Sequence, residues 1–333
     1  DSVSTTYFNL MGAESDNKFK ELAQEISPKL SAFSNKVLLD SKLFSRVKYL
    51  FEQIEDGDFT SEQKRLISEK YTDFTLNGAL LNDDDKEKVR KIDEELSKLS
   101  PKYSQNSLNA TNDYTYYTED KSILSGIPEL AKNQASETAK KKGKKSGWMF
   151  TLQMPSLLPV LKYANNREVR ETLSRASGKI SFGGKFDNQE IIKKIISLRF
   201  DKAQLLGFED HAEYTLQKRM AGNTKTVMNF IERLYEVYFS AAEKELDEIK
   251  ELAKKDGIHE FQVWDSAYYL EKLKIQKFDF SQEELRPYFE VENVLKGIFL
   301  RSAHNFCGFS FSHLANRKLR AFRPKSTRSA LRR

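Results

Sequence analysis

Apolar residues recur every three or four positions along most of this chain, the spacing that gathers side chains on one face of an α-helix. Three such stretches precede residue 77: Phe19 to Leu30, Leu39 to Phe51, and Leu66 to Leu76. The turn signals Asp56-Gly57 and Asn77-Gly78 precede and end the third stretch. The pattern therefore predicts helix hairpins from about Asn17 to Glu119.

Two longer helices are predicted from their ends as well as from their apolar stripes. Three acids, Asp83, Asp84 and Asp85, precede the apolar stripe of residues 89–99. The helix dipole stabilises negative charge at the start of a helix. We read them as a helix start rather than a calcium site, because consecutive acids lack the alternating ligands of a calcium loop. The longest helix should begin at an Asn223 or Thr224 cap and stop near Lys255, before Gly257. With only 14 Gly and 7 Pro in 333 residues, long helices are expected.

One segment departs from the helical pattern. The lysine run 140–145 has the composition of a solvated loop, and the apolar run Trp148 to Leu152 follows it. The predicted fold class is mainly α: a long-helix array with at most one short β segment near 148–153. The lysine run is a candidate patch for carboxylates or nucleic acid, but it lacks the interleaved aromatic residues that stack on bases.

A series of motifs stands in order between residues 147 and 309. They are Gly147–Ser156, Asn166–Glu171, Phe182–Asn188, Leu205–Phe208, Arg219–Ala221, Trp264–Leu273, Leu285–Phe289 and Gly308-Phe309. The series resembles the zinc oligopeptidases of the thimet oligopeptidase and dipeptidyl carboxypeptidase group, peptidase family M3. The first two motifs look more like the bacterial dipeptidyl carboxypeptidase branch. The resemblance extends more weakly from about Phe8 to Phe311, and implies the helical array of the non-catalytic domain, beside a deep channel that admits short peptides.

The family's catalytic motif is not found in this sequence. The resemblance implies a helix with H-E-x-x-H, in which two histidines hold zinc and the glutamate is the general base. Of the four histidines, His211, His259, His304 and His313, only His259 precedes a glutamate, Glu260, and Val263 stands where the second histidine would be. His259 follows the turn signal Asp256-Gly257, so we expect an ordinary loop residue. We therefore predict no catalytic, metal-binding or cofactor-binding residue, and no zinc bound by this chain, although full-length relatives use zinc.

Charge is distributed unevenly along the chain. Residues 313–333 contain eight Lys and Arg and no acid, whereas the rest has 47 basic and 49 acidic residues. The formal net charge of +6 therefore depends on the tail. We expect this tail to be aberrant or disordered, with a frameshift after Phe311 as the favoured origin. The alternative is a basic arm that binds nucleic acid, but no nucleic-acid module accompanies it, so no such partner is expected.

Three regions are predicted: helical hairpins in 1–125, a central helical region in 126–312 that leads toward the missing zinc domain, and the basic tail 313–333. No signal peptide or membrane-spanning run is recognised. The single cysteine, Cys307, allows no intrachain disulfide, and we read it as a buried small residue. These features favour a cytoplasmic protein without a membrane partner.

The leading functional hypothesis is a partial M3-family zinc metallopeptidase that hydrolyses short peptides when complete. This chain would supply channel-wall helices and be inactive alone. The alternative is a non-catalytic helical module that binds peptides or proteins. Trp264, Tyr268 and Tyr269 belong to the core or, less favoured, line a substrate groove, and Asp265 is read as a helix N-cap.

Overall fold

The computed structural model describes residues 2–14, 16–279 and 282–306. Cys307 and the basic segment 313–333 lie outside the described residues. The fold is 75% helical, with one two-stranded sheet in its described part, which confirms the mainly α prediction. Residues 1–265 and 266–333 form two compact units. The boundary near residue 125 stays a prediction.

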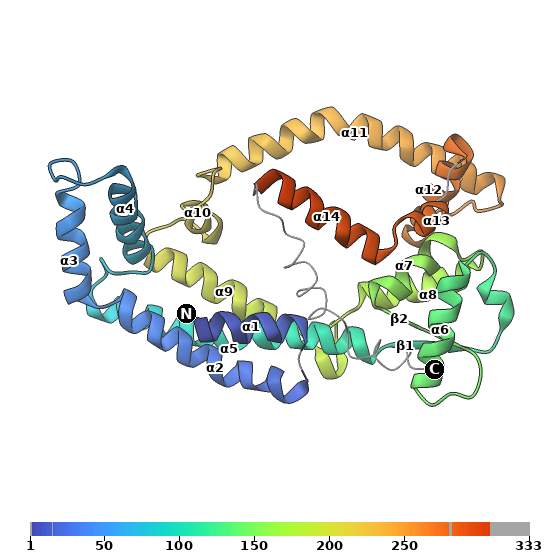
Figure 1. The fold of residues 1–333 in the computed structure, drawn as a ribbon, viewed down its shortest axis with the longest axis horizontal. Coiled ribbons are helices and arrows are strands. Elements are labelled where there is room, and N and C mark those ends of the chain that lie inside the picture. Colours follow the sequence, from blue (N-terminus) through green and yellow to red (C-terminus); the bar gives the residue numbers. More distant parts are fainter. Residues whose placement is uncertain (1, 15, 280–281, 307–333) are drawn as a thin grey trace. The chain divides into compact units, whose positions relative to one another are not determined.

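The first four helices follow one another along the chain (Figure 1). They are α1 (Ser2–Ala13), α2 (Asn17–Leu38), α3 (Ser41–Glu52) and α4 (Ser61–Leu76). α3 packs against α4 as a hairpin. Phe44 of α3 stacks on Phe74 of α4 with ring centroids 5.9 Å apart, and both rings are buried. α1 was not predicted. It is held by Tyr7, which stacks on Phe19 at 4.7 Å and donates a hydrogen bond to the Phe19 carbonyl oxygen.

The long helix α5 (Asp83–Asp113) packs against α2 and against α9 (Gln189–Leu205). Asn82 is its N-cap, and the three predicted acids occupy its first turn, so the helix-start interpretation is confirmed. Asn188 crosslinks α5 to α9, because its buried side chain donates to the Tyr103 carbonyl oxygen at 3.0 Å and accepts from Asn106 at 2.9 Å. α5 therefore packs against both α2 and α9 in the first unit.

The sheet joins two segments that lie far apart in sequence. Strand β2 (Trp148–Thr151), which was predicted, pairs antiparallel with β1 (Thr115–Thr118), which was placed in the helical region. The register pairs Thr115 with Thr151 and Thr118 with Trp148. Gly147 has a φ of +84°, and a Cβ there would lie 2.6 Å from the Thr118 carbonyl oxygen, so only glycine fits where the chain enters β2.

The main hydrophobic core surrounds this sheet. It is built from β2, α6 (Glu129–Lys141), α7 (Met154–Tyr163) and α8 (Arg167–Gly178). Its most buried members are Phe150, Val160, Ala164, Val169 and Leu173. Lys140 and Lys141 belong to the last turn of α6, and the rest of the lysine run forms the loop before β2.

The first unit continues through α10 (His211–Leu216) to α11 (Thr224–Lys255), the longest helix among the described residues. Asn223 caps α11 by accepting from the Thr226 N–H at 2.8 Å, and Gly257 follows its end with a φ of +84°. Both ends agree with the prediction. α12 (Val263–Phe278) begins in the first unit and continues into the second, which also contains α13 (Gln282–Leu285) and α14 (Val291–Phe306). A turn of 3-10 helix at Arg286–Tyr288 lies between α13 and α14.

Candidate functional site

The histidines do not form a metal centre in the described residues. His259 lies exposed in the loop between α11 and α12, as its turn signal predicted, and Val263 is the first residue of α12. Among the residues that the structure describes, no group of three or more His, Cys, Asp and Glu side chains could hold a metal ion. The position of His259 and Glu260 therefore does not fit a zinc site.

His211 is the other histidine whose side chain is described. It is the first residue of α10 and is partly buried. Burial, together with the nearby charges of Arg199 and Lys202, lowers the pKa of His211 below its ordinary value. The imidazole is therefore neutral at pH 7, although no zinc-binding partner accompanies it in the part of the chain that the structure describes. The side chain of His304, and all of His313, lie outside the described residues.

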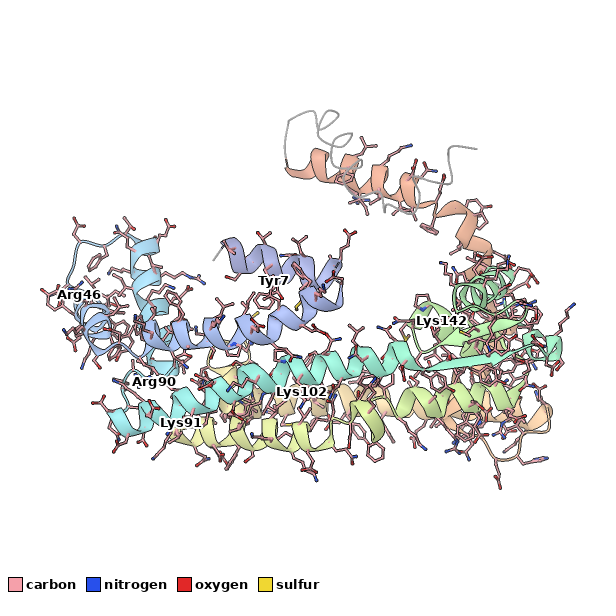
Figure 2. All side chains as sticks on the ribbon, turned by 90° about the horizontal axis from the view of Figure 1, so that it is seen from below. Tyr7, Arg46, Arg90, Lys91, Lys102 and Lys142 are labelled. Atoms are coloured by element: carbon pink, nitrogen blue, oxygen red, sulfur yellow. The ribbon has the colours of Figure 1, made fainter. Side chains whose placement is uncertain are left out.

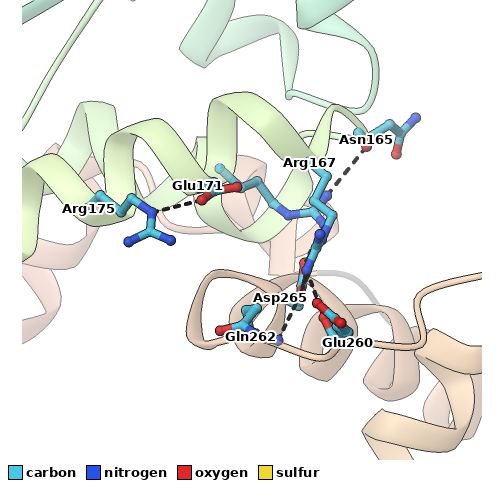
Figure 3. Close-up of polar contacts among 8 residues, drawn as sticks. Asn165, Arg167, Glu171, Arg175, Glu260, Gln262 and Asp265 are labelled. Carbon is cyan, nitrogen blue, oxygen red and sulfur yellow. Dashed lines mark hydrogen bonds and ion pairs between the residues drawn. The ribbon is translucent and has the colours of Figure 1, made fainter.

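The most highly organised polar group of the first unit is built around Asp265 (Figure 3). Arg167 and Arg170 stand three positions apart at the start of α8, so both point from one face of that helix. The Asp265 carboxylate accepts from Arg167 Nη2 at 2.8 Å and from Arg170 Nη2 at 3.0 Å. Asp265 is 0% exposed and Arg170 is 2% exposed. We call these three residues, with Trp264 and Arg175, the Asp265 cluster.

The backbone around Asp265 completes the cluster. The Gln262 N–H donates to the Asp265 carboxylate at 3.0 Å, and Arg167 Nη2 donates to the Glu260 carbonyl oxygen at 2.9 Å. Asp265 is therefore the third residue of α12, reaching back to the residue before the helix, and its interpretation as the N-cap was wrong. In this contact the N3 side chain accepts the backbone N–H of the N-cap residue, which is one of the two hydrogen bonds of a capping box. The loop that contains His259 is thus fixed by arginine hydrogen bonds.

Trp264 contacts two cations. The guanidinium of Arg175 is 4.6 Å from the centre of its ring system, and that of Arg167 is 5.7 Å from it. Arg175 is held by Glu171 at 2.7 Å, one turn earlier on α8. Cation–π contacts of this kind add to the ion pairs. Tyr269 is buried and Tyr268 is partly buried, which agrees with the core interpretation of the aromatic residues.

The electrostatics make Asp265 a structural residue. Burial alone would raise the pKa of the Asp265 carboxyl, but hydrogen bonds from Arg167, Arg170 and the Gln262 N–H outweigh it and hold the pKa below its ordinary value. A general base needs a pKa near the working pH and an accessible oxygen. Both Asp265 oxygens already accept arginine hydrogen bonds. The cluster can therefore hold α8 against the start of α12 but cannot take a proton from a substrate.

A second feature of the first unit is an uncovered face of α11. Ile249 and Leu252 are buried near the end of the helix, whereas the same face is exposed over several earlier turns. The exposed apolar residues on this face include Ile231, Leu234, Tyr235, Tyr238 and Leu246, and we call these five the α11 stripe. Residues spaced by three, four or seven share one helix face, so the stripe continues the buried face. An apolar surface of this extent is typical of an interaction site.

Fold and site together define a helical protein with a buried structural ion-pair cluster. Residues 160–321 match the sequence model of Peptidase family M3. Over 297 residues the chain is 35% identical to oligopeptidase A of Haemophilus influenzae, an alignment that covers 87% of this chain and 44% of the relative. It is 34% identical over 301 residues to oligopeptidase A of Salmonella typhimurium, covering 87% of this chain and 44% of the relative. Dipeptidyl carboxypeptidase of Escherichia coli is 28% identical over 312 residues, with 93% and 46% covered.

These matches confirm the resemblance: the chain belongs to peptidase family M3. Members of this family are generally zinc-dependent metallopeptidases. The chain spans less than half the length of the relatives it matches. Over the aligned length it is more similar to these oligopeptidases A than to this dipeptidyl carboxypeptidase, the branch that the first two motifs favoured.

The Asp265 cluster was not predicted from the sequence, although two motifs of the family resemblance form it. The signal was present in Arg167 and Arg170, two cations on one helix face. The sequence gives no sign of which carboxylate they meet, because that carboxylate lies 95 residues beyond Arg170. In the described part of the chain, no helix is long and apolar enough to cross a membrane.

Proposed function

We propose that this chain is the non-catalytic helical part of an M3-family zinc oligopeptidase or peptidyl-dipeptidase. In full-length form such a protein hydrolyses short peptides in the cytoplasm. The chain supplies helices to the wall of the peptide channel and is inactive alone. One observation carries the proposal: 297 residues align with an oligopeptidase, while the sequence contains one His-Glu pair and no H-E-x-x-H.

The Asp265 cluster supports a scaffolding role. It uses the charged residues of two family-like motifs to hold a loop and two helix ends, and it leaves no oxygen of Asp265 for chemistry. A channel wall needs such rigidity, because a peptide must be held in one geometry to react. The peptide-bond chemistry itself, a zinc-polarised water with a glutamate as base, requires residues that this sequence does not contain.

The α11 stripe supports the need for a further polypeptide segment. Its exposed residues continue a face that is buried at Ile249 and Leu252, so burial of the remaining turns would extend an existing core. The relatives have more than twice the length of the aligned region. We expect the segment that relatives have beyond this aligned region to cover the α11 stripe.

The first test is a peptidase assay with the chain alone. The purified chain is incubated with an internally quenched peptide of about eight residues, with and without zinc, beside oligopeptidase A of Haemophilus influenzae. We expect cleavage by the relative only. Zinc-dependent cleavage by the chain, removed by a chelator and retained through repeated purification, would show that the proposal of inactivity is wrong.

The second test supplies the absent segment. The chain is co-expressed with the part of oligopeptidase A that does not align with it, and the two are purified through a tag on one of them. We expect a stable complex, and its loss when Ile231 and Tyr235 on the stripe are both changed to Lys. The matched control places Lys at Glu232 and Glu236, which lie one position further along α11.

The alternative function, a peptide- or protein-binding module, predicts a different pair of results. A module of that kind should unfold cooperatively by itself and bind peptides without the further segment. Peptide binding by the isolated chain that depends on the α11 stripe, with no complex formed in the co-expression, would favour it over the proposal.

A further inference from the structure

The first unit contains a cavity that lies apart from the Asp265 cluster and the α11 stripe. Its volume is about 570 Å³, and it is lined by the C-terminal half of α2, the start of α3 and the first part of α5. Cavities of this size are typical of small-molecule sites. Side chains of both charge signs line it, so the cavity is polar rather than a packing defect.

The first sign of a ligand is Asn35 of α2. Its side chain lines the cavity and the residue is only 6% exposed. The Asn35 carbonyl oxygen accepts the Leu39 N–H at 3.0 Å, but its side-chain amide makes no hydrogen bond within the described part of the chain. A ligand with both donors and acceptors could pair with this amide from the cavity.

The second sign is a buried ammonium next to the cavity. Lys86 of α5 is 5% exposed, and its Nζ donates to Ser41 Oγ at 3.0 Å. Among the described residues Lys86 takes part in no ion pair. Ser41 lines the cavity and is the first residue of α3, where the helix dipole adds positive potential. Since the Ser41 oxygen accepts from Lys86, its own hydrogen can be donated to an anion in the cavity.

The carboxylates that line the cavity differ in how they are used. Arg90 pairs with Glu87 at 3.2 Å, Lys98 pairs with Glu94 at 2.6 Å, and Asp40 accepts the Leu43 N–H at 2.7 Å. Asp83 has no such partner within the described residues. Figure 2 shows Arg90 and Lys91 side by side on α5, and both also line the cavity. Asp83 is exposed to solvent and is thus the lining carboxylate that is free to receive a cation.

We propose that this cavity binds a small zwitterion, a free amino acid or a dipeptide. Its carboxylate accepts hydrogen bonds from Ser41 and Asn35 and neutralises the charge of Lys86, while its ammonium group pairs with Asp83. A ligand that is only an anion would leave Asp83 unpaired, and a ligand that is only a cation would leave Lys86 without a counter-ion. The inference does not rest on the proposed function, because binding requires neither zinc nor peptidase activity.

The test is calorimetric titration of the purified full chain with glycylglycine up to about 10 mM, a range that detects millimolar binding. N-acetylglycylglycine, which lacks the ammonium group, and glycylglycinamide, which lacks the carboxylate, are titrated in parallel. We expect each to bind at least about tenfold more weakly, the loss of one charged hydrogen bond. Equal binding of either analogue, or no binding of glycylglycine, would overturn the proposal.

Variants locate the site. Asp83→Asn should weaken glycylglycine binding at least about tenfold. Asp84→Asn should leave it unchanged, since Asp84 is equally exposed in the same first turn but does not line the cavity. Asn35→Leu and Lys86→Met should each abolish binding. Circular dichroism checks folding, and Asn35→Leu provides the second variant if Lys86→Met fails to fold. Equal effects of Asp83→Asn and Asp84→Asn would refute this placement.

Discussion

Replacement of Asp265 by alanine tests the Asp265 cluster most directly. The change removes a carboxylate that accepts from Arg167 Nε at 3.0 Å, Arg167 Nη2 at 2.8 Å, Arg170 Nη2 at 3.0 Å and the Gln262 N–H at 3.0 Å. It leaves the two guanidinium groups in place. Because Arg170 is 2% exposed, its charge then remains inside the protein without the carboxylate that neutralised it.

The magnitude follows from burial. Removing one partner of a buried ion pair costs about 3–5 kcal/mol, since the remaining charge stays desolvated. Arg167 is 34% exposed, so water screens its charge. The loss of the ion pair between Arg167 and Asp265 therefore adds less than about 1 kcal/mol. We therefore expect Asp265→Ala to lower the free energy of unfolding by about 3–5 kcal/mol. The control is Glu171→Ala, which breaks a partly exposed pair one turn apart and should cost about 0.5 kcal/mol.

The assay is urea unfolding followed by tryptophan fluorescence, in which Trp264 reports on the cluster itself. With a slope of about 3 kcal/mol/M, a loss of 4 kcal/mol lowers the unfolding midpoint by about 1.3 M. A shift no larger than that of Glu171→Ala would refute the assignment of a buried, mutually stabilised pair. The double variant Arg170→Met, Asp265→Leu should be less destabilised than Asp265→Ala, because it leaves no guanidinium at position 170. A double variant at least as unstable would contradict the same reasoning.

Three further predictions follow from the structure. The pKa of Asp265 is lower in the folded than in the unfolded chain. The contribution of its carboxylate to the free energy of unfolding is therefore complete above the unfolded pKa of about 3.9 and is lost as the pH falls through the folded pKa. The stability difference between the parent and Asp265→Asn should be equal at pH 7 and 5 and shrink below pH 4. Asn188→Ala should lower the free energy of unfolding by about 2–3 kcal/mol in thermal unfolding, since the 1% exposed amide links Asn106, Tyr103 and Ser107; a loss under about 0.5 kcal/mol would count against the crosslink. His259→Ala should leave the zinc content of the dialysed chain unchanged by mass spectrometry, because no second ligand accompanies His259 among the described residues. Loss of one equivalent of zinc would contradict this.

The parts of the fold that the sequence predicted are those encoded locally. α4 begins after a Thr60 capping box and ends at Leu76 with Asn77 as its C-cap, and α11 lies between its Asn223 cap and Gly257. In each case residues next to the helix satisfy its terminal groups, so the ends can be read without knowing the partner helices.

The parts that were missed depend on distant contacts. The strand β1 forms because Thr115–Thr118 pairs with residues about 33 positions later, and nothing near residue 115 predicts that pairing. α1 lacks a strong apolar stripe and is held through the contacts of Tyr7 with Phe19. The cavity beside Asn35 has the same origin, since α2 and α5 meet only in the folded chain.

The Asp265 cluster shows what two of the family motifs do in the structure. Asn166–Glu171 and Trp264-Asp265 were two separate pieces of the resemblance, and the structure joins them through Arg167, Arg170 and Asp265. The two motifs are therefore one structural unit, and their residues make hydrogen bonds that exclude a proton-transfer role for Asp265. A chain can retain this unit, and with it the family resemblance, without containing a complete H-E-x-x-H. It follows that these motifs are evidence for the helical scaffold alone, and that activity has to be judged from the zinc motif itself.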